Sequence, residues 1–305
     1  MPSGTFRMRD TFPQIAVLGG GLLGGSLALA LGSLEKPPLV RLWARREVTL
    51  AEARCRGIDH ATTRLDEALA GASLVILAVP VGSMPELVRA ALAAGLPDPC
   101  LLTDVGSVKQ TPHQTIAPIL AHSPVTFIGS HPMAGSEQTG ISAADARLFN
   151  GAACLLTNDG LAPAPLCTAL ERFWQAIGCH TTWMSAAAHD ASVARISHLP
   201  HILAASGARI CLDDPSLARF AGGGLRDTTR VAAGNPDMWA EILIENRQSI
   251  VGPLRESLND LAALVTLLEA GEQEPTRQWL ATAKQRRDAL TLEKKQETTN
   301  FTNTE

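Results

Sequence analysis

The chain has 305 residues, of which 46% are hydrophobic and 18% are charged, and this composition excludes an intrinsically disordered or coiled-coil protein. The formal net charge of −4 and the dispersed Lys and Arg residues argue against a nucleic-acid-binding surface of the basic kind. No apolar run reaches the roughly 18 residues that a membrane span needs, and residues 1–13 lack the apolar core of a signal peptide.

The first half of the chain alternates short apolar runs with helical patterns. Strands are predicted at 14–18, 39–43, 74–79, 100–104, 125–129 and 153–157. Helices are predicted between them at 22–31, 48–56 and 85–94. Continuous apolar strands spaced by helices indicate a parallel sheet that is covered on both faces, so we expect a doubly wound α/β domain over residues 14–183.

Strand signals stop after residue 183, and we expect an all-helical domain at 184–292. Its long helices are predicted at 185–212, 236–268 and 276–290. Ser185 is a suitable N-cap for the first of them. The polar segment 293–305 is predicted to be disordered. The six cysteines form no C-x-x-C pair, which argues against a zinc site or a disulfide framework and favours reduced thiols in a cytoplasmic protein.

A glycine motif follows the first strand and opens the first helix. Residues 19–24 are Gly-Gly-Gly-Leu-Leu-Gly, which fits the G-x-G-x-x-G pattern. Glycines there allow a tight turn and a close approach of the backbone to a pyrophosphate, which the N-terminus of the helix attracts. A ligand-free glycine turn is the alternative, but the strand–turn–helix context favours a Rossmann-type dinucleotide site. The expected contacts are Gly19, Gly21, Leu22, Leu23 and Gly24.

The end of the second strand bears on the choice of cofactor. An acidic residue there would accept a hydrogen bond from the ribose 2′-hydroxyl of NAD, but this strand ends at Arg45 and Arg46, with no acid before Glu47. Two guanidiniums favour a 2′-phosphate, so we expect NADP and keep NAD as possible. Alternatively, both arginines are solvated and stack on the adenine. Val79 and Pro80, at the end of the third strand, are expected on the nicotinamide side.

Two polar segments follow later strands, where open α/β sheets bind ligands. The first is TDVGSVK, with Ser107, and the second is GSHPMAGSE, with His131. A histidine beside a nicotinamide can accept the hydroxyl proton of an alcohol as hydride leaves the carbon. Ser107 could orient that imidazole or the hydroxyl. A packing histidine beside Pro132 is the alternative for His131, and its place at a strand end favours the catalytic role.

The helical half contributes two further segments. ISHLPH places Pro200 inside a helix, beside His198. The glycine run 222–224 precedes Arg226 and Arg230, and such arginines can bind carboxylates through two parallel hydrogen bonds. Surface arginines at an ordinary helix start are the alternative.

Taken together, these segments resemble one family. GGGLLGGS, LAVPV, TDVGSVK, GSHPMAGSE, ISHLPH, GLRDTTRVAAGNP and MWAEILIENR occur in the order found in the prephenate/arogenate dehydrogenases of tyrosine biosynthesis, from about Gln14 to Leu290. Ser130 departs from the family, because many members have glycine there, and its side chain is expected to crowd the loop slightly. We expect no fused chorismate mutase before Gln14 and no regulatory domain after Leu290.

The resemblance implies a homodimer that oxidatively decarboxylates prephenate or arogenate with NAD(P) and needs no metal. It makes His131 the base for the C4 hydroxyl and Ser107 its hydrogen-bonding partner. The substrate-binding residues that it implies are Arg230, His198, Glu137, Arg226 and Trp239.

Two other readings are compatible with parts of the sequence. A different Rossmann-type hydroxy-acid dehydrogenase would be expected to place a catalytic lysine in the helical half, whereas the candidate base here is in the sheet domain. A non-enzymatic dinucleotide sensor would not need the Ser–His–Arg set.

Overall fold

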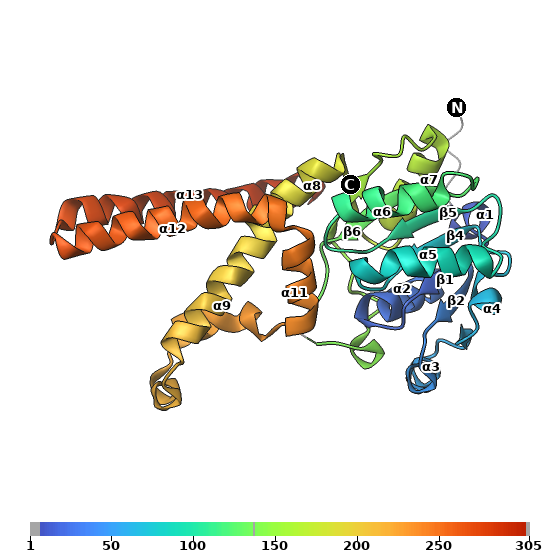
Figure 1. The fold of residues 1–305 in the computed structure, drawn as a ribbon, viewed down its shortest axis with the longest axis horizontal. Helices are drawn as coiled ribbons and strands as arrows, with labels where there is room; N and C mark the ends of the chain where they lie inside the picture. The colour runs from blue at the N-terminus through green and yellow to red at the C-terminus, as the bar shows by residue number, and fades with distance from the viewer. Residues whose placement is uncertain (1–6, 137, 303–305) are drawn as a thin grey trace. The chain divides into compact units, whose positions relative to one another are not determined.

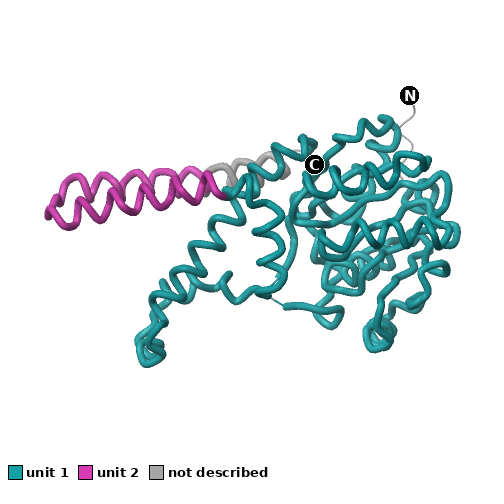
Figure 2. The backbone as a smooth tube through the Cα atoms, in the orientation of Figure 1, with its two compact units in different colours: residues 1–250 teal, residues 251–305 magenta. Residues whose placement is uncertain are grey.

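The computed structural model describes residues 7–136 and 138–302, with side chains through residue 290. The chain divides into two compact units, residues 1–250 and 251–305, which Figure 2 distinguishes by colour. Within the described ranges, no helix is long and apolar enough to cross a bilayer.

Unit 1 is built on an eight-stranded sheet with the strand order β3-β2-β1-β4-β5-β6-β7-β8 (Figure 1). The strands are β1 (Gln14–Leu18), β2 (Leu39–Trp43), β3 (Ala61–Thr62), β4 (Leu74–Leu77), β5 (Leu101–Asp104), β6 (Thr126–Pro132), β7 (Ala153–Thr157) and β8 (His180–Met184). The α-helices before and between them are α1 (Met8–Thr11), α2 (Leu22–Gly32), α3 (Glu47–Cys55), α4 (Leu65–Leu69), α5 (Met84–Ala93), α6 (Gln110–Leu120) and α7 (Ala164–Ala176). The predicted doubly wound α/β domain is therefore confirmed.

Both faces of this sheet are covered. On β1, Ile15 and Val17 belong to one buried cluster, together with residues of α2 and α7. Ala16 and Leu18, which alternate with them, belong to a second cluster, together with residues of α5 and α6. Because successive strand residues point to opposite faces, burial of all four places β1 in the centre of the domain.

The sheet differs from the prediction mainly at β6, β7 and β8. β7 pairs with β6 antiparallel, whereas every other pairing is parallel as expected. β8 was not predicted, because His180–Met184 contains two threonines and is only half-buried, so it lacks the apolar run of a central strand. The short β3 was also missed. β6 continues through Pro132, three residues further than expected, and so includes His131.

The helical part of unit 1 begins at Ser185, whose side chain accepts a hydrogen bond from the backbone N–H of Ala188, as an N-cap does. The helices are α8 (Ala186–Val193), a π-helical turn η3 (Ala194–His198), α9 (Leu199–Cys211), α10 (Gly223–Thr229) and α11 (Pro236–Glu245), with 3₁₀ turns η4 (Pro215–Phe220) and η5 (Arg230–Ala233) between α9 and α11. The expected single helix 185–212 is thus divided by the π turn just before Pro200, which lies at the start of α9. The expected helix 236–268 is divided at Asn246.

The two compact units divide at 250/251, and the domain boundary at 183/184 stays a prediction. The hydrogen bonds of α8 show why the first helical segment groups with the sheet. The Asp190 carboxylate accepts from the backbone N–H groups of Lys109 and Gln110, at 2.7 and 3.0 Å, so the first helical segment is tied to the sheet.

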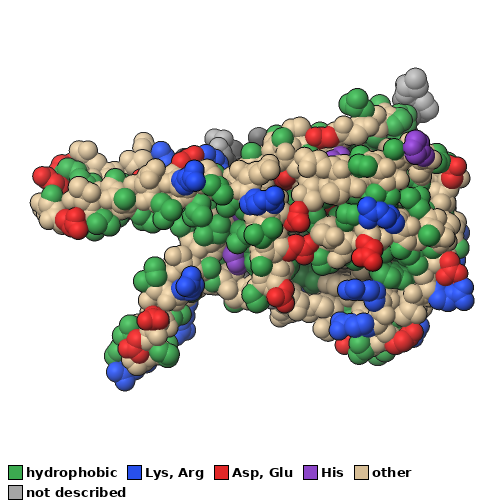
Figure 3. Space-filling view, in the orientation of Figure 1, with side chains coloured by type: hydrophobic (Ala, Val, Ile, Leu, Met, Phe, Trp, Pro, Cys, Tyr) green, Lys and Arg blue, Asp and Glu red, His purple; other side chains and the backbone are tan. Residues whose placement is uncertain are grey.

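Unit 2 contains most of α12 (Arg247–Glu269) together with α13 (Gln273–Thr302). The backbone turns between them at Gly271, in the left-handed region at φ +69°. Helix α13 continues through Thr302 where disorder was predicted from residue 293, and residues 303–305 lie outside the described part. Figure 3 shows hydrophobic side chains on the surface, and in α12 the exposed ones follow a heptad-like spacing: Val251, Leu258, Leu261, Val265 and Leu268.

Candidate active site

The glycine turn after β1 has the geometry that a dinucleotide site requires. Gly19 has φ +134°, and a Cβ there would lie 2.1 Å from the carbonyl oxygen of Ala78. A Cβ on Gly24 would lie 1.9 Å from the carbonyl oxygen of Gly19, so the helix could not pack as closely on the strand. A Cβ on Gly21 would meet nothing within 4 Å. Gly19 and Gly24 are therefore required by the fold, and Gly21 leaves open space where a pyrophosphate could approach.

The other expected cofactor residues border this turn. Leu22 and Leu23 are half-buried in the first turn of α2, and Val79 Cγ1 would lie 3.2 Å from a Cβ on Gly19. The end of β2 is held against the turn by the hydrogen bond from the N–H of Gly19 to the carbonyl of Trp43, at 2.9 Å. Pro80 is exposed beyond β4.

The two arginines after β2 are both exposed. The nearest acid in the sequence, Glu47, is engaged elsewhere, because it accepts a hydrogen bond from the Thr63 hydroxyl at 3.3 Å. Arg45 and Arg46 therefore remain the charged groups at this strand end, and the turn with its flanking residues fits a dinucleotide.

His131 lies in the last residues of β6, opposite Leu155 of β7, and is only 8% exposed. Its Nδ1 lies 2.8 Å from Nε2 of His189 on α8. Burial, followed by the positive charge of Lys109 and by the neighbouring His189 and His198, lowers the pKa of His131 well below 6.5. The imidazole is therefore neutral at physiological pH, as a base must be before it accepts a proton.

A carboxylate completes the arrangement behind His131. Nδ1 of His189 lies 2.8 Å from Oδ1 of Asp190, and both residues are buried. Burial acts to raise the pKa of Asp190, but hydrogen bonds from His189 and from the backbone N–H groups of Gln110 and Lys109 outweigh it and leave the pKa below the usual range. The pKa of His189 is lowered by burial, against the opposing effect of Asp190.

A fully buried ion pair lies next to these histidines. Lys109 Nζ donates to Asp104 Oδ2 at 2.5 Å and to the carbonyls of Gly106 and Val108 at 2.9 and 3.0 Å, which uses all three of its hydrogens. Asp104 also accepts from the backbone N–H of Ser130 at 3.1 Å. Asp104 is the last residue of β5, so the pair joins the end of β5 to β6, three residues before Ser107.

Ser107 is half-buried in the loop after β5. Within the described residues it makes no hydrogen bond, and the ring partner of His131 is His189. Ser130, which was expected to crowd its loop, is accommodated in the core. Its hydroxyl accepts from Trp174 Nε1 at 3.0 Å and pairs with the Thr103 hydroxyl at 2.7 Å.

His198 is brought to the same network from the end of the π turn. Asn246 Nδ2 contacts both the backbone carbonyl of Asp190, at 2.9 Å, and Nδ1 of His198, at 3.1 Å. Because a carbonyl only accepts, this nitrogen must be the amide donor, and Nδ1 of His198 accepts its second hydrogen. Burial lowers the pKa of His198 to about 4, so its neutral ring carries the proton on Nε2.

Trp239 packs on two histidines of α9 and the π turn. It stacks on His201 with ring centroids 3.5 Å apart and meets His198 edge-on at 6.1 Å. A Cβ on Gly234 would lie 2.5 Å from Trp239 Nε1, so a glycine is needed for the indole to lie here. His198 and Trp239, both expected at the substrate site, are therefore in contact.

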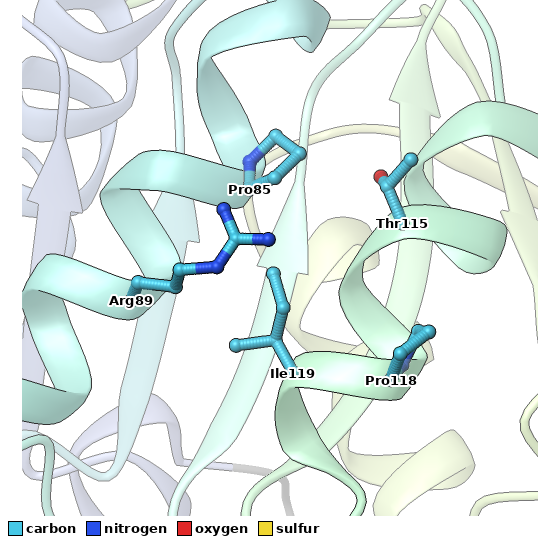
Figure 4. Close-up of a pocket in the computed structure, with 5 residues that line it drawn as sticks. All are labelled: Pro85, Arg89, Thr115, Pro118 and Ile119. Carbon is cyan, nitrogen blue, oxygen red and sulfur yellow. The ribbon is translucent and has the colours of Figure 1, made fainter.

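The remaining expected residues are less closely placed. Arg226 and Arg230 are both exposed. Arg226 lies within α10, which begins in the glycine run at Gly223, and Arg230 is the C-cap of this helix. Glu137 lies outside the described residues. A separate hollow of about 450 Å³ between α5 and α6 contains none of the expected residues (Figure 4), and it is lined by Pro85, Arg89, Thr115, Pro118 and Ile119.

Sequence reasoning missed His189, Asp190, Asn246 and the pairing of Asp104 with Lys109. One signal was available for two of them. Ala186, His189, Asp190 and Val193 are the buried residues of α8, so the spacing places a His-Asp pair on the apolar face of a helix. Such a pair requires partners, because buried polar groups are satisfied in stable folds.

A doubly wound sheet, a G-x-G-x-x-G turn and a neutral buried histidine at a strand end define a class, the nicotinamide-dependent dehydrogenases. The family description "Prephenate dehydrogenase, nucleotide-binding domain" matches residues 35–183, and "Prephenate dehydrogenase, dimerization domain" matches residues 185–282. The chain belongs to the prephenate dehydrogenase family.

Individual relatives agree with this assignment. The cyclohexadienyl dehydrogenase of Zymomonas mobilis is 34% identical over 84% of this chain and 89% of its own length. The prephenate dehydrogenase of Bacillus subtilis is 32% identical over 95% of this chain and 78% of its own length. Among solved structures, prephenate dehydrogenase from Aquifex aeolicus in complex with hydroxyphenyl propionate and NAD+ matches with a TM-score of 0.83 at 26% identity, covering 94% of this chain and 99% of that one.

Proposed function

We propose that this enzyme oxidises prephenate or arogenate at the C4 hydroxyl with NADP as the preferred cofactor and releases the C1 carboxylate as CO2. The single observation that carries the proposal is the buried neutral His131 at the end of β6, in a chain of the prephenate dehydrogenase family. The two substrates share a cyclohexadienyl ring and differ in a keto or an amino group on the side chain.

His131 takes the hydroxyl proton from the substrate in this proposal. Its Nδ1 is engaged with His189, which leaves Nε2 for the substrate. A nicotinamide, when bound, supplies the hydride acceptor. As the ring becomes dienone-like, the electrons of the C1–carboxylate bond can enter it, and loss of CO2 leaves an aromatic phenol. Aromatisation makes the reaction effectively irreversible.

The other residues hold the substrate. Arg230 binds a carboxylate, with Arg226 as a lesser contributor, because a guanidinium offers two parallel hydrogen bonds. His198 offers the substrate a neutral Nε2–H donor beside Trp239. Ser107, which has no hydrogen bond to give up among the described residues, is free to bind the substrate hydroxyl or Nε2 of His131.

NADP is favoured over NAD by the end of β2. Arg45 and Arg46 are exposed there, and Glu47 is bonded to Thr63. The pyrophosphate would lie against Gly19, Gly21 and Gly24, with Leu22, Leu23, Val79 and Pro80 around it.

We further propose a homodimer formed through the helical region 184–292. The family description of residues 185–282 as a dimerization domain supports it, as does the exposed heptad-like apolar row on α12. A cytoplasmic location is supported by six cysteines that are all free.

Steady-state kinetics with both substrates and both cofactors test the proposal. We expect turnover of prephenate or arogenate, with a higher kcat/KM for NADP than for NAD. Replacing Arg45 and Arg46 with alanine should raise KM for NADP much more than KM for NAD. A higher kcat/KM of the wild type with NAD would contradict the cofactor assignment, and no turnover of either substrate would contradict the reaction.

A further inference from the structure

Two hydrogen bonds link His131 to His189 and His189 to Asp190. The donor in each of them can be identified from which atoms carry a hydrogen. Asp190 Oδ1 receives the backbone N–H of Lys109 at 2.7 Å, and Oδ2 receives that of Gln110 at 3.0 Å. A carboxylate held by N–H donors only accepts. Nδ1 of His189, 2.8 Å from Oδ1, must therefore carry the hydrogen of that contact.

The position of this hydrogen on His189 determines where His131 carries its own. A neutral His189 with its hydrogen on Nδ1 has a lone pair on Nε2. That nitrogen lies 2.8 Å from Nδ1 of His131, and a hydrogen bond of this length between two ring nitrogens needs one hydrogen. His131 must provide it, so Nδ1 of His131 is protonated and Nε2 holds the lone pair.

We propose that Asp190 and His189 are positioning residues that fix the tautomer of His131, so that its basic nitrogen is Nε2. In the opposite tautomer Nε2 would carry a hydrogen and could not accept one from a substrate hydroxyl. Once His131 has taken a proton, the negative charge of Asp190 also stabilises the cation through His189. The catalytic importance of this tautomer rests on the proposed function, whereas the tautomer itself rests on the geometry alone.

The burial of the network explains why it can hold one arrangement. His189 is fully buried and Asp190 is 1% exposed. Water cannot supply alternative partners there, so each hydrogen must go to the acceptor that the fold provides. The carboxylate comes from α8 and its two backbone donors from the start of α6, so the arrangement depends on the docking of α8 against the sheet.

Nitrogen-15 NMR of the histidine side chains tests the tautomer directly in the wild-type enzyme, with His131→Asn used to assign the signals of His131. We expect a protonated Nδ1 and an unprotonated Nε2 for His131. An unprotonated Nδ1, or equal populations of the two tautomers, would overturn the proposal. This measurement needs no turnover, so a correct tautomer in an enzyme that is inactive on prephenate and arogenate would contradict only the proposed function.

Substitution of the carboxylate tests the catalytic consequence. Asp190→Asn removes the charge and places an amide donor within the network, and the equivalent substitution in the serine-protease triad lowers kcat by about 10⁴ through the wrong tautomer. With a second imidazole in between, we expect kcat to fall at least about tenfold, KM to change less, and the His131 signals to move toward the other tautomer. His189→Phe, which removes the acceptor of His131 and leaves the Asp190 carboxylate in place with its backbone donors, should give the same redistribution.

Asp159→Asn is the matched control. The Asp159 carboxylate accepts from the N–H of Ala186 at the start of the same helix, at 2.9 Å, and an asparagine keeps that acceptor. This variant should retain both kcat and the wild-type histidine signals. If Asp190→Asn and His189→Phe fold with unchanged tautomers and unchanged kcat, the two residues are structural and the proposal is wrong.

Discussion

The glycine turn follows β1 and His131 lies in the last residues of β6, and because both strands belong to the parallel part of the sheet, the two regions lie at the same end of it. They are built by different means. The turn is made of backbone and lacks side chains where Gly19 and Gly24 pack, whereas the network is made of buried side chains from distant segments, such as Lys109 and Asp190. The turn is held by steric fit and tolerates no added atom at Gly19 or Gly24, whereas the network is held by electrostatic interactions and tolerates no missing partner.

Loss of the base should produce the largest effect on catalysis. His131→Asn is expected to lower kcat by about 10²–10⁴-fold, the usual contribution of a general base. Asparagine keeps a polar group at the position, so KM for the substrate should be maintained. Near wild-type kcat in steady-state assays would refute the role of His131.

Breaking the buried ion pair should destabilise the fold. Lys109→Met leaves Asp104 as an unpaired buried charge, which typically costs about 3–5 kcal/mol of unfolding free energy. Denaturant unfolding of the variant measures this loss. A double variant with Asp104→Leu should lose less than the sum of the single changes, and strict additivity would mean that the pair does not act as a unit.

Removal of the proposed carboxylate anchor should act on substrate binding alone. Losing a charge-assisted pair costs on the order of 2–5 kcal/mol, so Arg230→Ala should raise KM for the substrate at least tens-of-fold, at about 1.4 kcal/mol per decade. Cofactor affinity should stay unchanged. A lower Tm with unchanged KM would show instead that Arg230 supports the end of α10.

Two glycine variants separate packing from cofactor binding. Gly24→Ala places its Cβ against the Gly19 carbonyl and should lower both Tm and cofactor affinity. Gly21→Ala meets nothing in the protein, so Tm should hold while the cofactor Kd rises about tenfold, or about 1.4 kcal/mol. Calorimetry and cofactor titration distinguish the two. Equal losses of Tm in both variants would contradict the assignment of open space to Gly21.

The buried histidines should make stability fall on the acid side. His131, His189 and His198 have folded-state pKa values below 6.5, so the unfolded chain binds more protons as the pH falls. Their penalty is absent above pH 6.5 and grows toward the folded-state pKa, by up to about 1.4 kcal/mol per pH unit for each histidine. Tm should therefore fall between pH 7 and pH 5, and a flat profile would mean that folding does not lower the pKa values of these rings.

The two regions also differ in what the sequence could predict. The glycine turn is formed by consecutive residues, 19–24, whose spacing of glycines shows where side chains must be absent. It could therefore be predicted together with β1 and α2. The network brings together residues 81 apart, such as Lys109 and Asp190, and only the three-dimensional fold places them. β8 was missed for a related reason, since a half-buried edge strand with two threonines has no distinctive apolar pattern.

The most direct test of the account is the stoichiometry of the reaction, measured as CO2 released per nicotinamide reduced when the enzyme acts on prephenate or arogenate. We predict one CO2 for each reduced nicotinamide, because oxidation at C4 and loss of the C1 carboxylate belong to one reaction. Reduction of the cofactor without CO2 release would contradict the account and identify the chain as a dehydrogenase of another hydroxy acid.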